Sequence, residues 1–290
     1  MPSPREIRRR IRSVKNMSQI TRAMEMVAAS KMRRAQDRVT SGRPYSERLR
    51  EVLGDLASLQ LDGDDLKKFP LLEQREVKRT MVILITPDRG LAGSLTTNIL
   101  RRATQYIRNE APGGNPMVLA VGKKGRDFAA RTGQDLIAEF IQIGDRPTLD
   151  DVRPIAQVAI HEFLEGRVDA VHILYPQFIN TLTQRPEVLQ LLPITQPEGS
   201  SERAADYIFE PSSDDVLNQL LPRYVEVNLY QAVLENVASF YSAQMVAMRN
   251  ATDNAKELSD DLSLAYNKAR QAQITNEVAE IAAGANAFRK

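Results

Sequence analysis

Cysteine is absent from this sequence of 290 residues, and histidine occurs only as His161 and His172. Without cysteine, disulfides, thiolate catalysis, iron–sulfur clusters and cysteine-based zinc sites are excluded. Two separate histidines, one on a predicted helix and one on a predicted strand, do not form a metal-ligand set. No window approaches the roughly 18 consecutive apolar residues of a membrane-spanning helix. We therefore expect a soluble or peripheral protein that uses no metal or other cofactor.

Helix breakers are scarce at both ends of the chain. Residues 223–290 contain no proline and one glycine, Gly284, and residues 5–41 contain neither. Such stretches predict long helices. In the C-terminal stretch, mostly apolar residues recur every seven positions in two columns, the pattern of a helix supercoiled on a partner. One column holds Val227, Leu234, Tyr241, Met248, Ala255, Leu262 and Ala269, and the other holds Tyr230, Val237, Gln244, Ala251, Leu258, Ala265 and Ala272.

The N-terminal stretch predicts an amphipathic helix over residues 5–41, with Ser3 as its cap and Pro4 in its first turn. Gly42 and Pro44 are expected to interrupt it, and a shorter helix follows before the acidic turn LDGDD. At 1.5 Å per residue, the C-terminal helix alone would extend roughly 100 Å, too far to finish inside a small domain. The economical arrangement is an antiparallel pair of the two terminal helices.

Between the terminal helices, short apolar runs alternate with helical patterns. This alternation predicts crossover units on a mostly parallel sheet, with an antiparallel pair of strands at its end. The predicted strands lie in VKRTMVILIT, NPMVLAVG, QDLIAEFIQI, RVDAVHILYPQFI and VLQLLPI, and the predicted helices span residues 94–109, 123–131 and 149–165.

The predicted fold class is therefore α+β, with a long antiparallel coiled coil of the N- and C-terminal helices and an inserted α/β, Rossmann-like domain. We expect residues 1–60 to form the N-terminal coiled-coil helix and the short helix after it. Residues 77–195 are expected to form the α/β domain, and residues 212–290 the long C-terminal helix.

Positive charge is concentrated near the N-terminus, since residues 1–43 hold twelve Arg or Lys residues and three acids. Such a segment has a specific task or a specific neighbour. An Arg-rich start also fits an organellar transit peptide, but the regular apolar seam favours a segment that stays on the mature protein. Binding of nucleic acid is a further alternative. It is disfavoured because residues 1–43 lack aromatic side chains and their bases surround much of the helix.

Two glycine loops between a strand and a helix could cradle a phosphate, TPDRGLAGSL and VGKKGRDF. The first is not G-x-G-x-x-G, and the second lacks the Ser or Thr that holds magnesium in a P-loop. We interpret both as turn geometry. No carboxylate or serine lies at a spacing that would form a catalytic set with either histidine. The chain does not look catalytic, although a free-standing α/β enzyme with helical oligomerisation arms stays an alternative.

Several segments can be compared with a known family: IRRRIRSVKNMSQITRAMEMVAASKMRRAQ, TPDRGLAGSLTTN, VAMRNATDNAKEL and YNKARQAQITNEVAEIAAGA. Together they closely resemble the gamma subunit of bacterial F-type ATP synthase, from the first helix to the last residues. The resemblance implies a coiled-coil shaft inside a ring of three alpha and three beta subunits. It implies that the α/β domain at the foot of the shaft docks on the epsilon subunit and the membrane c ring. It also implies a peripheral position at the cytoplasmic face of the cell membrane and no nucleotide chemistry in this chain.

The resemblance further implies contact residues on the shaft. Arg270, Gln271 and Thr275 match the polar cluster that meets a catch loop of beta, although a solvated polar patch would look the same. Met24 lies in a segment that resembles the part facing an acidic lever loop of beta, and simple seam packing is its alternative.

At the foot, Tyr207 and Glu210 in ADYIFEP match the region that meets the c ring and epsilon. The implied mechanism follows from symmetry, because a two-helix shaft cannot be threefold symmetric while the ring around it nominally is. Each beta subunit would meet a different face of the shaft, and rotation would exchange those contacts in sequence. Torque would thereby be converted into changes of nucleotide affinity.

Overall fold

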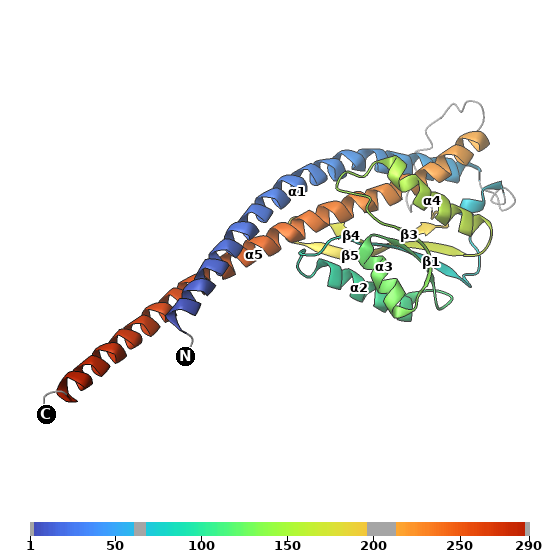
Figure 1. The fold of residues 1–290 in the computed structure, drawn as a ribbon. Helices are drawn as coiled ribbons and strands as arrows, with labels where there is room; N and C mark the ends of the chain where they lie inside the picture. The colour runs from blue at the N-terminus through green and yellow to red at the C-terminus, as the bar shows by residue number, and fades with distance from the viewer. Residues whose placement is uncertain (1–2, 61–67, 196–212, 288–290) are drawn as a thin grey trace. The chain divides into compact units, whose positions relative to one another are not determined.

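The structure, a computed structural model, describes residues 3–60, 68–195 and 213–287 (Figure 1). The chain divides into two compact units, one of residues 1–28 with 245–290 and one of residues 29–244. Two long helices, α1 (Pro4–Gln60) and α5 (Ser213–Ala287), contribute residues to both units. The prediction of a long helix at each end of the chain is therefore confirmed.

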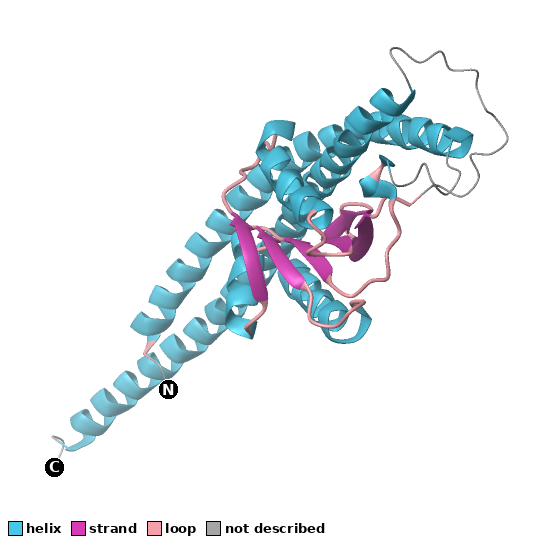
Figure 2. Cartoon of the chain, turned by 90° about the vertical axis from the view of Figure 1, so that its right-hand side faces the viewer, coloured by secondary structure: helices cyan, strands magenta, loops and turns pink. Residues whose placement is uncertain are grey.

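The unit of residues 29–244, here called the α/β unit, contains a five-stranded sheet in the order β3-β2-β1-β4-β5 (Figure 2). β1 is parallel to β2 and β4, β2 is parallel to β3, and β5 is antiparallel to β4. The predicted parallel sheet with a final antiparallel pair is confirmed. The strands are β1 (Thr80–Ile85), β2 (Met117–Val121), β3 (Asp135–Phe140), β4 (Ala170–Phe178) and β5 (Gln184–Leu192).

Three α-helices connect the parallel strands, α2 (Leu95–Gln105), α3 (Lys123–Thr132) and α4 (Leu149–Leu164). The helix predicted for residues 94–109 changes to a π-helical turn, η3 (Tyr106–Glu110), and a short 3-10 turn, η2 (Pro70–Leu72), precedes β1. α4 begins with a capping box, in which the carboxylate of Asp151 accepts the backbone N–H of Thr148 at 2.8 Å.

Side chains cover both faces of the sheet in the α/β unit. Met81, Ile83 and Ile85 of β1 belong to the large apolar cluster that includes α4 and the first part of α5. Val82 and Leu84 alternate with these residues along the strand and are both buried, so they face the other side of the sheet. Helices α2 and α3 lie on that side (Figure 1). Because a strand buried on both faces needs no polar alternation, β1 reads as a continuous apolar run.

The prediction that Gly42 and Pro44 interrupt the first helix is wrong, because α1 continues through both residues. A proline inside a helix removes one N–H donor and costs about 3 kcal/mol. Tertiary packing offsets this cost, since Val39 and Leu49 on either side of Pro44 are buried. A side chain at position 42 would also approach Gln231 of α5 to 3.0 Å, so the glycine allows close packing.

The other unit, here called the helical unit, consists of the first part of α1 and the last part of α5. Its contacts run antiparallel, because Thr21 pairs with Thr252 whereas Glu25 pairs with Arg249. The predicted antiparallel pair is thus confirmed within this unit. The buried side chains are Ile7, Thr21 and Ala28 of α1 and Met248, Thr252, Ala255 and Ser259 of α5.

One column of the predicted seam is displaced by one residue in the helical unit. Thr252 and Ser259 are buried there, whereas Leu258 is 49% exposed. The hydroxyl oxygens of Thr21 and Thr252 lie 2.7 Å apart, so a buried hydrogen bond takes the position expected for an apolar contact. The apolar pattern predicted the wrong column because small hydroxyl side chains can also be buried between two close helices when they hydrogen-bond to each other.

Candidate functional site

The end of α5 carries an exposed surface in the helical unit. Every side chain described from residue 270 to residue 283 is exposed, including large apolar side chains. These are Ile274, Val278 and Ile281, at 51%, 60% and 72% exposure, and we call them the apolar stripe. Their spacing of four and three residues places them on one face of the helix. Exposed apolar side chains gathered in this way mark an interaction surface.

The predicted catch-loop residues lie in the same exposed segment. Arg270, Gln271 and Thr275 are all exposed, and the Thr275 hydroxyl donates a hydrogen bond to the backbone carbonyl of Gln271 at 2.9 Å. Gln271 and Thr275 are one turn apart and share a face, which also includes Ile274. The structure therefore brings the predicted polar residues together with the apolar stripe, and their contact with a beta subunit stays a prediction.

α1 presents a second exposed apolar set in the helical unit. Met17, Ile20, Met26 and Val27 are each more than half exposed. Met24, the predicted lever-loop residue, is half-buried among them. The adjacent Glu25 accepts a hydrogen bond from Arg249 of α5 at 3.0 Å. The predicted foot residues Tyr207 and Glu210 lie outside the residues that the structure describes.

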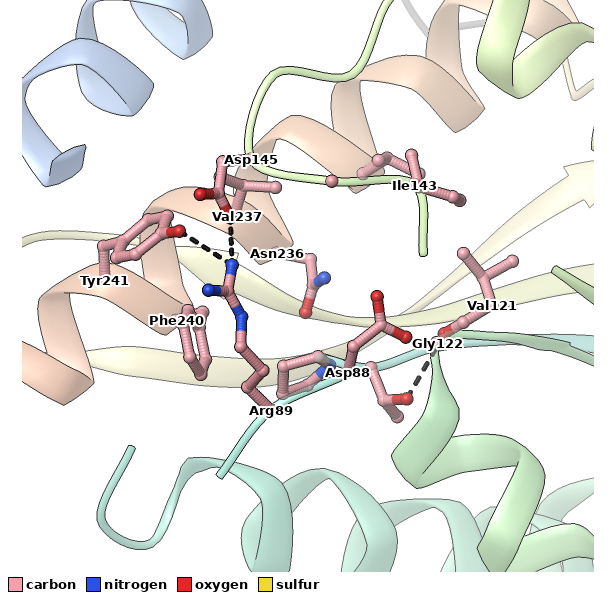
Figure 3. A pocket seen from close by; sticks show the side chains of 14 residues that line it. Asp88, Arg89, Val121, Gly122, Ile143, Asp145, Asn236, Val237, Phe240 and Tyr241 are labelled. Carbon is pink, nitrogen blue, oxygen red and sulfur yellow. Dashed lines mark hydrogen bonds and ion pairs between the residues drawn. The ribbon is translucent and has the colours of Figure 1, made fainter. Parts of the chain in front are cut away.

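A charge cluster lies inside the α/β unit, where sequence analysis predicted no site (Figure 3). Asp145, in the loop between β3 and α4, accepts hydrogen bonds from Lys31 of α1 at 2.5 Å and from Arg89 of the β1–α2 loop. The hydroxyl of Tyr241 on α5 accepts from Lys31 at 3.3 Å and from Arg89 at 3.1 Å. We call these four residues the Asp145 cluster.

The electrostatics of the cluster favour its charged form. Burial acts most strongly on Asp145 and would raise its pKa, but hydrogen bonds from Lys31 and Tyr241 and the charges of Arg89 and Lys31 outweigh it, so the pKa is lowered. The hydrogen bond to Asp145 raises the pKa of Lys31 above its ordinary value. Burial raises the pKa of Tyr241, so its hydroxyl stays protonated. Near neutral pH the Asp145 carboxyl is therefore deprotonated, the Lys31 amine is charged and the Tyr241 hydroxyl is protonated, as their hydrogen bonds require.

The two glycine loops singled out in the sequence meet beside this cluster. Asp88 and Arg89 of the first loop and Gly122 of the second line a cavity with a volume of about 60 Å³, together with side chains of α5 (Figure 3). A cavity needs roughly 10–15 Å³ on this scale to hold one water molecule. The cavity therefore has room for a few small molecules of water size and is far too small for a nucleotide.

The backbone amides of the second loop are already engaged within the protein. The N–H of Lys123 donates to the Asp88 carboxylate at 2.8 Å, and the N–H of Gly125 donates to the Thr86 hydroxyl at 2.8 Å. The Lys124 N–H donates to the carbonyl of Pro87 at 3.4 Å. Since an anion site at a helix N-terminus needs free N–H groups, these contacts support the interpretation of the loop as turn geometry.

The two histidines lie where the sequence placed them. His161 is exposed on α4. His172 on β4 packs beside the ring of Tyr106, with 5.6 Å between ring centroids, and burial lowers its pKa. Among the residues that the structure describes, no group of three or more His, Cys, Asp or Glu side chains is arranged to hold a metal ion. No helix in the described ranges is long and apolar enough to cross a membrane.

Sequence reasoning missed the Asp145 cluster because its members lie on four separate segments. Lys31 belonged to a run of bases, and Tyr241 belonged to the apolar seam, so neither suggested the other. A polar hydroxyl within an otherwise apolar column was the one available signal. Lys31 and Asp145 are 114 residues apart in the sequence. Their contact therefore depends on the fold, and no local sequence pattern predicts it.

Comparisons with known proteins give consistent results. A family profile described as ATP synthase matches residues 3–288. The chain is 59% identical to the ATP synthase gamma chain of Roseiflexus castenholzii and 53% identical to that of Chloroflexus aurantiacus, covering 99% of both chains in each case. Its fold is similar to a chain in the cryo-EM structure of the Euglena gracilis mitochondrial ATP synthase in rotational state 3. That likeness has a TM-score of 0.70 at 20% identity and covers 98% of this chain and 94% of the other.

Proposed function

This chain belongs to the ATP synthase gamma chain family, and we propose that it is the central-stalk rotor subunit of an F-type ATP synthase. In this role it transmits torque between a membrane c ring and the catalytic sites of an alpha/beta ring. Ion transport is thereby coupled to ATP synthesis or hydrolysis. The chain itself performs no catalytic step, and the catalytic sites belong to its partners.

The observation that carries this proposal is the exposed surface of the helical unit. If the two helices packed only against each other and had no further partner, we would expect their large apolar side chains to be buried. Here the apolar stripe is 51–72% exposed on a segment where no described side chain is buried. Exposed apolar patches rimmed by polar residues are typical of protein-binding surfaces. A surrounding ring of subunits supplies the apolar partner surface that the segment lacks.

The proposed mechanism depends on differential contact energy. A rotor can shift a catalytic site only by the difference in its contact energy with the open and closed forms of that site. The helical unit offers unlike faces for this purpose. On α5, the apolar stripe and Gln271 differ from the face that carries Gln273 and Glu277, which pair with each other at 2.8 Å. Rotation would present these faces in turn to each beta subunit.

The catch-loop proposal is tested by the double substitution Arg270→Ala with Gln271→Ala. Truncating interface residues that matter typically costs more than about 1 kcal/mol, so we expect turnover or coupling to fall roughly fivefold or more. Because both side chains are exposed, folding of the α/β unit should be unchanged. Arg108→Ala with Asn109→Ala, two exposed positions of η3 in the α/β unit, is the matched control. ATP synthesis driven by an ion gradient is measured, and unchanged synthesis in the first variant would count against the site.

The rotor role as a whole is tested by reconstitution. The chain is expressed with and without alpha and beta subunits, and complex formation and magnesium-dependent ATP hydrolysis are assayed. We expect a stable stoichiometric complex that hydrolyses ATP, and no hydrolysis by the chain alone. Hydrolysis by the isolated chain would favour the α/β enzyme alternative, and the lack of a complex would contradict the rotor role.

We also propose that the chain is peripheral at the cytoplasmic face of a bacterial membrane, and that Tyr207 and Glu210 contact the c ring and the epsilon subunit. This proposal is supported by the family match and by the bacterial source of the relatives. The division into segments 1–60, 77–195 and 212–290 is proposed on the same grounds. Crosslinking from Tyr207→Cys to epsilon or c in the assembled complex tests the contact, and products with neither subunit would contradict it.

A further inference from the structure

Asp145 lies at the meeting point of three parts of the α/β unit. One carboxylate oxygen accepts from Lys31 on α1, and the other accepts from Arg89 in the β1–α2 loop. Tyr241 on α5 completes the arrangement, because its hydroxyl accepts from both cations. The side chains of Lys31 and Asp145 are about one third exposed whereas that of Arg89 is 60% exposed, so water screens the contact with Arg89 more strongly than the contact with Lys31. One carboxylate thus joins both long helices to the loops at the carboxyl edge of the sheet.

Apolar packing in the same unit has a different property. Leu229, Ala232 and Val233 of α5 pack in the large core cluster and hold the helix against the sheet. The hydrophobic effect is non-directional, so a row of such side chains resists separation more than it resists a small rotation or slide. Charge-assisted hydrogen bonds are short and directional, and they weaken quickly when the geometry changes. The Asp145 cluster therefore adds directional restraint at the carboxyl edge of the sheet, beside the buried hydrogen bonds that Glu235 and Ser239 of α5 make to the backbone of β4.

We propose that Asp145 is a positioning residue that holds the sheet and its loops at one fixed angle around α1 and α5. The inference rests on the proposed rotor function, in which torque applied to the α/β unit must reach the helices without slipping. Lys31 and Arg89 act through their hydrogen bonds to Asp145. The Tyr241 hydroxyl accepts from both cations and holds them in place. Loss of the carboxylate widens the range of angles between sheet and helices and reduces the fraction of torque that drives synthesis.

The angle is measured by pulsed electron paramagnetic resonance in the assembled complex. Because the natural chain has no cysteine, Asp37→Cys on α1 and Arg131→Cys at the end of α3 place spin labels at two exposed sites of this chain. We expect Asp145→Asn to widen the distribution of distances between the labels about twofold, as a network loses its shared charged partner. Asp145→Glu keeps the charge and should largely retain the narrow distribution.

Asp150→Asn is the matched control for the loss of one carboxylate. Asp150 contacts Arg153 inside α4 at 2.8 Å and is 79% exposed, and Arg153 has its own separate contact with Glu226 of α5, which does not depend on the Asp150 carboxylate. Its substitution should leave the distance distribution unchanged. A double-mutant cycle of Lys31→Met and Asp145→Asn adds a second check, because residues that act through one another give non-additive effects.

The functional readout is the ratio of gradient-driven ATP synthesis to ATP hydrolysis. In Asp145→Asn this ratio should fall about threefold at unchanged complex yield, within the range expected for the loss of a partly exposed ion pair. An unchanged distribution and ratio in Asp145→Asn, with coupled wild-type complex, would overturn the positioning role alone. Equal widening in Asp150→Asn would also overturn it. Wild-type complex that assembles but shows no coupling would instead contradict the proposed rotor function.

Discussion

The two compact units of this protein bury their side chains in different ways. In the α/β unit, large apolar side chains such as Ile83 and Phe163 are completely buried. In the helical unit, the buried set includes Thr21, Thr252 and Ser259, while large apolar side chains stay exposed. The α/β unit therefore contains a core of its own. The helical unit gains less from its own packing, and its exposed apolar faces are available to partners.

The comparison predicts unequal tolerance to truncation of apolar side chains. Phe163→Ala should destabilise the chain by about 3–5 kcal/mol, because it removes a fully buried ring. Ile281→Ala, in the apolar stripe, should change the free energy of unfolding by less than about 0.5 kcal/mol, because that side chain is 72% exposed. Urea unfolding followed by circular dichroism measures both. Equal losses would break the proposed difference between the units.

The α/β unit also depends on close backbone approaches. At Gly122 the φ angle is +97°, and an added Cβ would lie 2.0 Å from the carbonyl oxygen of Thr86. Gly122→Ala should therefore cost on the order of 3 kcal/mol, since strain and steric overlap act together. Gly133 has a φ of +66° but no atom within 4 Å of an added Cβ. Gly133→Ala should cost only about 1–2 kcal/mol, and thermal unfolding that ranks the two equally would contradict this account.

The buried hydroxyl pair sharpens the description of the helical unit. Thr21 and Thr252 share one hydrogen bond in which either hydroxyl can donate, and the hydroxyl that accepts can donate to a backbone carbonyl, that of Ser18 for Thr21 or of Met248 for Thr252. Thr21→Val removes the hydrogen bond between the two hydroxyls, while Thr252 keeps its bond to the Met248 carbonyl, and should cost about 0.5–1.5 kcal/mol. The double variant with Thr252→Val should cost less than the sum of the single changes. Additive losses in denaturant unfolding would show that the two hydroxyls do not act as a pair.

The smallest predicted effect concerns pH. Burial lowers the folded-state pKa of His172 below the unfolded value of about 6.5, so the folded state favours neutral imidazole. Stability from this residue is present above pH 6.5 and is lost as pH falls towards the folded pKa. Both histidines belong to the α/β unit, so this loss is confined to it. His172→Gln should reduce the loss of folding stability as the pH falls from about 7 to about 5.5, and a pH profile identical to that of the unsubstituted chain would contradict the assignment.

The strands, their parallel crossovers and the final antiparallel pair were accessible from sequence because they depend on local signals, whereas the strand order β3-β2-β1-β4-β5 was not predicted. Apolar runs bounded by turn residues predicted every strand of the sheet, and the turn near Asn180 predicted its antiparallel end. The break at Gly42 and Pro44 was predicted from propensity alone. The helix-propensity penalty of Gly42 and Pro44 is only a few kcal/mol. The burial of Val39 and Leu49 outweighs this penalty, so the helix continues.

The two candidate sites also differ in how far they depend on the tertiary structure. Arg270, Gln271 and Thr275 were named because they match a cluster implied by the family resemblance, and the structure places all three on one exposed helical segment. The Asp145 cluster could not be named from sequence, because its four members come from α1, α5 and two loops and meet only in the folded unit. No spacing in the chain encodes such a meeting.

The sequence by itself determined the two long helices, the strands of the sheet and the antiparallel pair at its end. Each of these follows from periodicity, breaker residues and composition, which act over a few residues. Only the tertiary structure decided that α1 continues through Pro44, that hydroxyls occupy the seam at Thr21 and Thr252, and that Asp145 joins both helices. The physical reason is that packing and paired burial act between segments far apart in the chain, and they can outweigh local preference.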